Sequence, residues 1–158
     1  MRQVAPFFLL LVSLLVASPM LGQKDSLLGT WVLNRGSSDF MPENETLQSR
    51  TMLFAAAENG VKCTITTVNE GGNGRTTIDN TYVARYDGKD VPIDSSALDT
   101  VALKRIDANT VERIGKIRGK QVETATMKIS ADGKVLTVAT TGSIDGRDYR
   151  STQIFERQ

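Results

Sequence analysis

Beyond its first two dozen residues, the chain alternates between short runs of β-branched or aromatic residues and tight-turn sequences. Such runs are typical of half-buried strands. Strands are predicted at residues 28–33, 46–56, 61–68, 76–86, 100–106, 110–117, 122–129, 135–141 and 149–156, with a short extra strand at 91–93. Pro92 confines this extra strand to an edge or a bend. The segment 54–58 has helical propensity, but it runs into Asn59-Gly60 and is predicted to end a strand.

Turn sequences separate these runs at short intervals. Asn59-Gly60, Asp132-Gly133 and Asp145-Gly146 are strong turn signals, and residues 71–74 are predicted to form a loop. Strands joined by tight turns lie beside one another, and an open meander of this size exposes two edges. The sequence therefore predicts an all-β fold, an up-and-down antiparallel meander of 8–10 strands closed into a barrel. A sandwich of two meander sheets is the alternative.

The N-terminal stretch has the pattern of a secretory signal peptide. Arg2 precedes an apolar run at residues 7–17, and Ser18, Pro19 and Gly22 follow it. The run is too short to span a bilayer as a helix. We therefore predict a signal peptide at residues 1–23, a single domain at 24–158, and an exported protein in the periplasm or outside the cell. An uncleaved anchor is the alternative.

The composition excludes several kinds of binding partner and catalytic site. Removing residues 1–23 takes one of the 19 basic residues and none of the 18 acidic ones, so the mature chain has no net charge. Such a chain has no electrostatic reason to bind nucleic acid or an anionic membrane. It contains no histidine, which excludes Ser-His-Asp and His-ligated metal sites. Cys63 is alone and is predicted to be a buried core residue. We expect no cofactor, no metal, no stable membrane anchor, and a monomer.

Two segments carry a family resemblance. Gly29-Thr30-Trp31 has the Gly-x-Trp pattern of lipocalins and fatty-acid-binding proteins, and residues 151–157 resemble the last strand of the fatty-acid-binding group. With the meander between them, the chain resembles bacterial exported lipocalin-like proteins of the calycin superfamily. The resemblance implies a calycin-type barrel in which Trp31 closes one end, with Arg150 or Arg157 stacked against it as the cation–π partner.

The chain also departs from that family in two places. The fatty-acid-binding group has Arg-x-Tyr on its final strand, where this sequence has Gln153 and Phe155. If a lipid binds, the resemblance therefore favours one without a carboxylate, although Gln153 could equally face solvent. In addition, residues 34–45 are too short for the family's two-helix lid and show no amphipathic period. We predict an irregular loop there and no helical lid.

Strand alternation gives the candidate lumen residues. They are Tyr82, Tyr86, Leu103, Arg105, Arg113, Tyr149, Gln153 and Phe155. If the faces that carry Arg105 and Arg113 point inward, each guanidinium needs a carboxylate or a bound anion, because an unpaired buried charge is costly. Alternatively, a bulge turns these side chains outward, or their stems line the barrel mouth while their heads reach water.

Three functions are compatible with this pattern. The first is an exported, non-enzymatic protein that binds a small hydrophobic or amphipathic molecule in the barrel. The second is a structural or interaction barrel with a filled core, acting through loops or an edge strand. The third is an enzyme, which would need a carboxylate of raised pKa facing Tyr82, Tyr86 or Tyr149.

Overall fold

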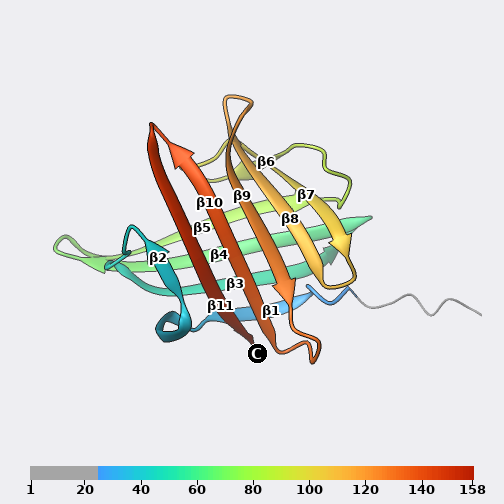
Figure 1. Ribbon diagram of the computed structural model, residues 1–158, viewed down its shortest axis with the longest axis horizontal. Helices are drawn as coiled ribbons and strands as arrows, with labels where there is room; N and C mark the ends of the chain where they lie inside the picture. Colours follow the sequence, from blue (N-terminus) through green and yellow to red (C-terminus); the bar gives the residue numbers. More distant parts are fainter. Residues whose placement is uncertain (1–24) are drawn as a thin grey trace, which may run out of the picture.

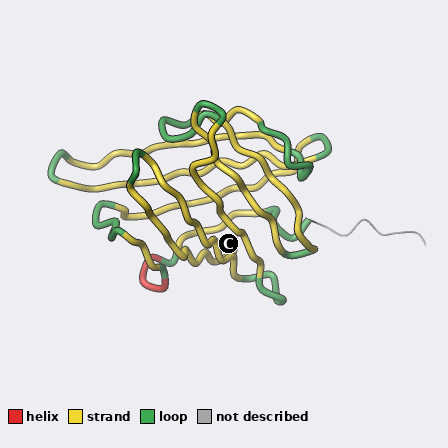
Figure 2. The backbone as a smooth tube through the Cα atoms, turned by 45° about the horizontal axis from the view of Figure 1, so that its top comes forward, coloured by secondary structure: helices red, strands yellow, loops and turns green. Residues whose placement is uncertain are grey.

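The computed structural model describes residues 25–158, and most of them belong to one antiparallel β-sheet (Figure 1). Its strands are β1 (Gly29–Leu33), β2 (Asp39–Met41), β3 (Leu47–Ala57), β4 (Gly60–Gly71), β5 (Gly74–Ala84), β6 (Val91–Asp94), β7 (Thr100–Asp107), β8 (Thr110–Ile117), β9 (Lys120–Ile129), β10 (Val135–Ile144) and β11 (Arg147–Arg157). One single-turn 3₁₀ helix, η1 (Arg35–Ser37), interrupts them (Figure 2).

The sheet closes into a ten-stranded barrel. Apart from β2, each strand pairs with the next in chain order, and β1 also pairs with β11, with Trp31 opposite Arg157. Strands β8–β11 cross in front of β1 and β3–β5, so the barrel consists of two layers (Figure 1). The all-β, up-and-down, antiparallel prediction is confirmed, and the sandwich alternative is wrong because the first and last strands are hydrogen-bonded to each other.

The tight turns are supported by the backbone. Arg118 and Gly119 have φ values of 51° and 74°, and Asp145 and Gly146 have 52° and 75°. Two successive residues with positive φ define the type I′ turn, whose twist matches that of the flanking strands. The predicted loop at residues 71–74 is shorter than expected, because β4 continues to Gly71 and β5 begins at Gly74.

The interval between the first two long strands differs from the expected irregular loop. It contains η1 and the short strand β2, which pairs with β11 outside the barrel ring. Ser38 anchors the segment, since its backbone N–H donates to Arg35 and the backbone N–H of Ile154 donates to its Oγ at 2.9 Å. Three residues with mixed burial are too few to show a strand period, so β2 could not be predicted from the sequence. The described residues contain no helix that could span a membrane.

The core lies inside the barrel and includes the fully buried Trp31. Fully buried side chains there come from most strands: Phe54, Val61, Leu103, Val111, Met127 and Leu136. Cys63 lies among them, as predicted. The predicted signal peptide, residues 1–23, falls outside the described part of the chain.

Candidate functional site: a half-filled barrel

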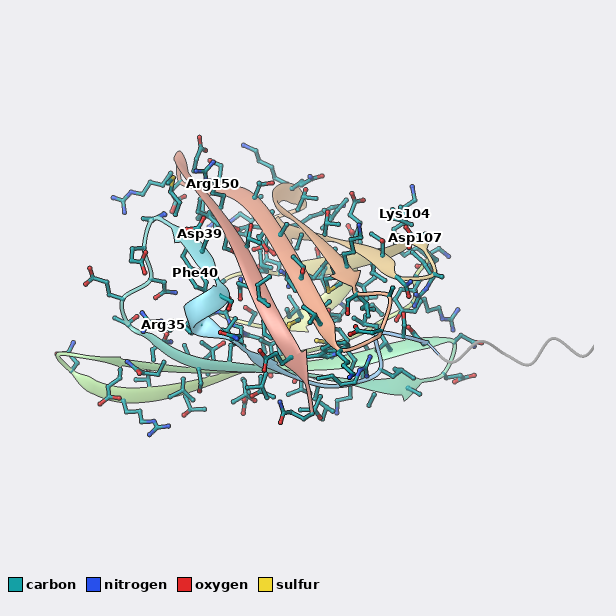
Figure 3. The ribbon with its side chains drawn as sticks, turned by 60° about the horizontal axis from the view of Figure 1, so that its bottom comes forward. Arg35, Asp39, Phe40, Lys104, Asp107 and Arg150 are labelled. Carbon is teal, nitrogen blue, oxygen red and sulfur yellow. The ribbon has the colours of Figure 1, made fainter. Side chains whose placement is uncertain are left out.

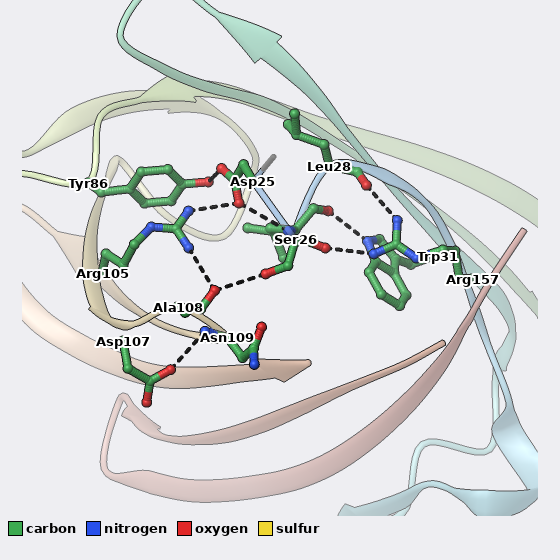
Figure 4. Close-up of polar contacts among 11 residues, drawn as sticks. Asp25, Ser26, Leu28, Trp31, Tyr86, Arg105, Asp107, Ala108, Asn109 and Arg157 are labelled. Atoms are coloured by element: carbon green, nitrogen blue, oxygen red, sulfur yellow. Dashed lines mark hydrogen bonds and ion pairs between the residues drawn. The ribbon is translucent and has the colours of Figure 1, made fainter. Parts of the chain in front are cut away.

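Trp31 closes one end of the barrel. Its side chain is fully buried, its Nε1 donates to the Leu27 carbonyl at 2.9 Å, and the Arg157 guanidinium lies 4.0 Å above its ring (Figure 4). Arg157 also donates to the carbonyls of Ser26, Leu28 and Gly133, each at 2.6 Å. Arg157 is therefore the cation–π partner. Arg150, the other candidate, is exposed near β2.

Gly29 is required by the same arrangement. Its φ is 132°, which disfavours any side chain, and a Cβ atom at this position would lie 2.6 Å from Nη1 of Arg157. The Gly-x-Trp pattern thus combines two requirements: Gly29 leaves room for the guanidinium, and Trp31 provides the ring on which it stacks. We call this part of the barrel the closed end.

Arg105 also belongs to the closed end, where it is paired. Its guanidinium lies 2.8 Å from the Asp25 carboxylate and 4.0 Å from the centre of the Tyr86 ring (Figure 4). The Tyr86 hydroxyl donates to Asp25 at 2.5 Å. Burial opposes ionisation of Asp25, but the hydrogen bond from Tyr86, with further help from Arg105, lowers the pKa of this carboxyl. An enzymatic role needs a carboxylate with a raised pKa, so this pair does not supply one.

Arg113 points into the barrel and is paired there. It forms an ion pair with Glu123, and each side chain is 13 % exposed. Burial opposes the charged guanidinium, but the Glu123 carboxylate raises the pKa of Arg113. The Tyr149 hydroxyl donates to the second Glu123 oxygen at 2.8 Å. Burial, followed by the negative charge of Glu123, raises the pKa of Tyr149, so the phenol stays protonated.

The contact between Tyr149 and Glu123 depends on a glycine. Gly142 on β10 lies directly between Glu123 on β9 and Tyr149 on β11 in the strand register. A Cβ atom at position 142 would lie 2.4 Å from Cζ of Tyr149, so only glycine lets the ring cross this strand toward the carboxylate. Gly142 directly follows the strand predicted at residues 135–141, whereas the observed strand continues to Ile144, so the sequence did not indicate this close approach.

Arg50 is a further guanidinium inside the barrel, and the sequence analysis did not single it out. It lies on β3 opposite Thr67 of β4. Its Nε donates to Thr67 Oγ1 at 3.1 Å, and its Nη1 donates to Gln153 Oε1 at 2.6 Å. Gln153 in turn donates to Ser151 Oγ at 3.0 Å. Gln153 therefore faces the lumen and binds a protein cation. A single arginine in a polar run of β3 gave no basis for this prediction.

These polar side chains border a cavity of about 240 Å³ inside the barrel. Its apolar wall includes Met52, Ile65, Ile93, Leu98, Val138 and Phe155, and its polar wall includes Arg50, Arg113, Glu123, Tyr149 and Gln153. A second hollow of about 380 Å³ lies against residues 40–44 and shares Arg50, Arg113, Glu123, Thr140, Tyr149 and Gln153 with the first. Phe40 and Arg150 lie at this end of the barrel, while Lys104 and Asp107 lie at the other (Figure 3).

The predicted lumen residues divide between the two ends. Arg113, Tyr149, Gln153 and Phe155 line the cavity. Tyr82 and Leu103 are buried in the packed core, and Tyr86 and Arg105 lie at the closed end. Strand alternation grouped these residues by face and left the inward orientation of Arg105, Arg113 and Gln153 open, and it does not indicate which level of the barrel is hollow. Among the described residues, no group of three or more Cys, Asp or Glu side chains could hold a metal ion.

Comparisons with known proteins support the fold. No protein-family model and no curated protein matches the sequence. Among solved structures, the zebrafish ileal bile acid-binding protein, complexed with cholic acid, superposes with a TM-score of 0.53 and 9 % identity, covering 84 % of this chain and 99 % of its own. The siderocalin Ex-FABP gives a TM-score of 0.40 and 13 % identity, covering 84 % of this chain and 74 % of its own. The closed ten-stranded meander is of the calycin type.

Proposed function

We propose that this calycin-type barrel is an exported protein that binds a small amphipathic molecule in its cavity without covalent chemistry. The observation that carries the proposal is the division of the barrel interior. One end is packed solid around Trp31, while the other holds a space with an apolar wall on one side and a polar wall on the other. Ligand pockets commonly combine a hydrophobic lining with a few placed polar groups.

The size of the space sets the size of the ligand. The inner cavity, about 240 Å³, is slightly below the usual range for ligand pockets, and the adjoining hollow extends it. We therefore expect a compact ligand whose apolar part fills the inner cavity. The solved zebrafish protein of similar fold binds cholic acid, which agrees with a small-molecule role for this architecture.

One polar atom of the cavity wall still lacks a partner. The Oδ1 atom of Asn80 is buried and accepts no hydrogen bond from the described residues. Asn80 lines the inner cavity, opposite Ile65 in the strand register. Buried acceptors are nearly always satisfied, and leaving one unpaired costs about 1–3 kcal/mol. A ligand or water molecule with a hydrogen-bond donor would satisfy this atom.

Export is part of the proposal and rests on the sequence of residues 1–23. Their basic start, short apolar run and small residues have the composition of a signal peptide. N-terminal sequencing of the protein recovered from outside the cytoplasm tests this part. A new terminus near Gly22 or Gln23 is expected, and an intact Met1 in that fraction would contradict cleavage.

Ligand binding is tested with two variants that carry the same substitution on opposite faces of one strand. Thr140→Trp places an indole where the cavity meets the outer hollow, because Thr140 is buried and lines both. Thr141→Trp places the same indole on the exposed face of β10. We expect titration with the neutral fluorescent probe N-phenyl-1-naphthylamine to show binding to the wild type and to Thr141→Trp, and at least tenfold weaker binding to Thr140→Trp.

The natural ligand is sought in the same proteins. Organic extracts of the purified wild type and Thr141→Trp are expected to contain one amphiphile by mass spectrometry, and the extract of Thr140→Trp is expected to lack it. Equal probe binding by all three proteins, or identical extracts, would show that the cavity is not the binding site.

An interaction function is the second candidate, and an open strand edge favours it. β6 pairs with β5 only at Thr81 and Tyr82, so the stretch 74–80 of β5 has no neighbour on that side within the described residues. Ile78 on this stretch is 41 % exposed. Unpaired edges of this kind can accept a strand from another chain. Thr140→Trp separates the two candidates, because blocking the cavity leaves this edge unchanged.

A further inference from the structure

Arg50 differs from Arg105 and Arg113 because its hydrogen-bond partners are neutral. Arg105 pairs with Asp25, and Arg113 pairs with Glu123. Arg50 donates only to Thr67 and Gln153, and none of the ion pairs among residues 25–158 includes it. A guanidinium has five N–H donors. Three donors of Arg50 thus have no partner among the described residues.

The inner cavity consequently carries one excess positive charge. Its charged lining residues are Arg50, Arg113 and Glu123, and the last two neutralise each other. Burial and the positive charge of Arg113 lower the pKa of Arg50, and the negative charge of Glu123 offsets this only in part. An arginine nevertheless stays protonated in a protein. A buried cation without a counterion is costly, and a bound anion removes that cost.

The position of Arg50 suits a ligand with one charged group. It lines both the inner cavity and the outer hollow, so its free N–H groups lie at the boundary between them. Met52, two residues further along β3, continues the lumen face into the apolar wall together with Phe155. A head group on Arg50 would therefore place an attached apolar body against that wall.

We infer that the ligand is an organic monoanion, with a carboxylate, sulfonate or sulfate head held by Arg50 and an apolar body in the inner cavity. This inference rests on the proposed function, since it names the chemical class that the same cavity takes. It departs from the expectation of a neutral lipid that Gln153 suggested. Gln153 positions the Arg50 guanidinium, and this guanidinium binds the anionic head group of the ligand.

The test compares two fluorescent probes that differ in one anionic group. 1-Anilinonaphthalene-8-sulfonate is N-phenyl-1-naphthylamine with a sulfonate added to its naphthalene ring. At 0.15 M salt the wild type should bind the sulfonate at least tenfold more tightly than the neutral probe. Arg50→Gln should bind both probes within about twofold of each other, and Arg50→Lys should retain a preference for the anion. Arg75→Gln, at an exposed position, should behave as the wild type.

Binding of the sulfonate to the barrel surface is controlled by Thr140→Trp, which should abolish the preference for the anion. If the wild type binds both probes equally, or if Arg50→Gln keeps the preference, the anion inference is overturned while the proposed function stands. If neither probe binds the wild type, both are overturned. The comparison on the wild-type protein decides the inference even if Arg50→Gln does not fold.

Discussion

The ion pair between Arg113 and Glu123 offers the sharpest test of the barrel interior. Each side chain is only 13 % exposed, and the Tyr149 hydroxyl donates to the same carboxylate at 2.8 Å. Glu123→Leu removes the carboxylate and leaves a buried guanidinium without its counterion. It also leaves the Tyr149 hydroxyl without an acceptor.

The cost follows from these two losses. Breaking a buried ion pair by removing one partner destabilises a protein by about 3–5 kcal/mol. An orphaned buried hydroxyl adds about 1–3 kcal/mol, although the two terms overlap because both groups relax toward the cavity. We expect Glu123→Leu to lower the free energy of unfolding by about 4 kcal/mol. That is a large fraction of the roughly 5–15 kcal/mol that stabilises a domain of this size.

Removing both charges should lower the free energy of unfolding much less than removing Glu123 alone. The double variant Arg113→Met, Glu123→Leu replaces the pair with apolar side chains, and such replacements are often neutral or stabilising. We expect it to unfold within about 2 kcal/mol of the wild type, the remaining loss coming from the unpaired Tyr149 hydroxyl. The coupling energy between the two sites would then be at least about 2 kcal/mol.

Urea denaturation at 25 °C, followed by Trp31 fluorescence, measures both values, since Trp31 is the sole tryptophan. Glu70→Leu, at an exposed position, controls for the substitution itself and should change stability by less than about 0.5 kcal/mol. If Glu123→Leu and the double variant are destabilised equally, the orphaned charge is not the cause and the argument for a buried pair is refuted.

Three further predictions concern the packed end of the barrel. Arg157→Met should lower the free energy of unfolding measured in urea by about 2–4 kcal/mol, because Trp31 loses its stacked cation and three carbonyls lose a charged donor. A decrease below about 0.5 kcal/mol would contradict this expectation. Burial raises the pKa of the Cys63 thiol to about 12, so its reaction with Ellman's reagent at pH 8 should be at least about a thousandfold slower in the native protein than in urea; comparable rates would show that the thiol is accessible. Burial opposes ionisation of Asp25, but the hydrogen bond from Tyr86 lowers the pKa of this carboxyl in the folded protein. The contribution of Asp25 to the free energy of unfolding is therefore present above the unfolded pKa, about 4, and is lost as the pH falls through the lower folded pKa. Asp25→Asn should therefore cost about 1–2 kcal/mol at pH 7 and progressively less below pH 4 in unfolding measurements, and a cost that does not vary with pH would contradict the linkage.

The sequence predicted the barrel because its signals are local. Turn sequences and strand alternation indicate the order of the strands and the face of each residue, and the family resemblance carried by Gly29 and Trp31 implied the closed end. The same alternation made Arg113 and Gln153 candidates for inward positions but left outward orientations open. These features need only near neighbours in the chain, and the structure places them accordingly.

The polar wall could not be predicted in the same way. Arg50 and Gln153 are 103 residues apart in the chain, and their contact depends on how the two sheet layers cross. The carboxylate that neutralises Arg113 is likewise visible only once β9 is paired with its neighbours. Alternation tells which face a side chain is on, but which level of the barrel stays empty depends on the summed volumes of side chains from many strands.

Because Trp31 and the residues packed around it fill one end of the barrel, a small molecule would enter the cavity from the opposite end. A molecule that arrives under residues 40–44 meets the polar wall before it reaches Phe155. Under the proposed function, an amphiphile would therefore pass its apolar part beyond the guanidinium groups first and would bind with its head group facing the open end of the barrel.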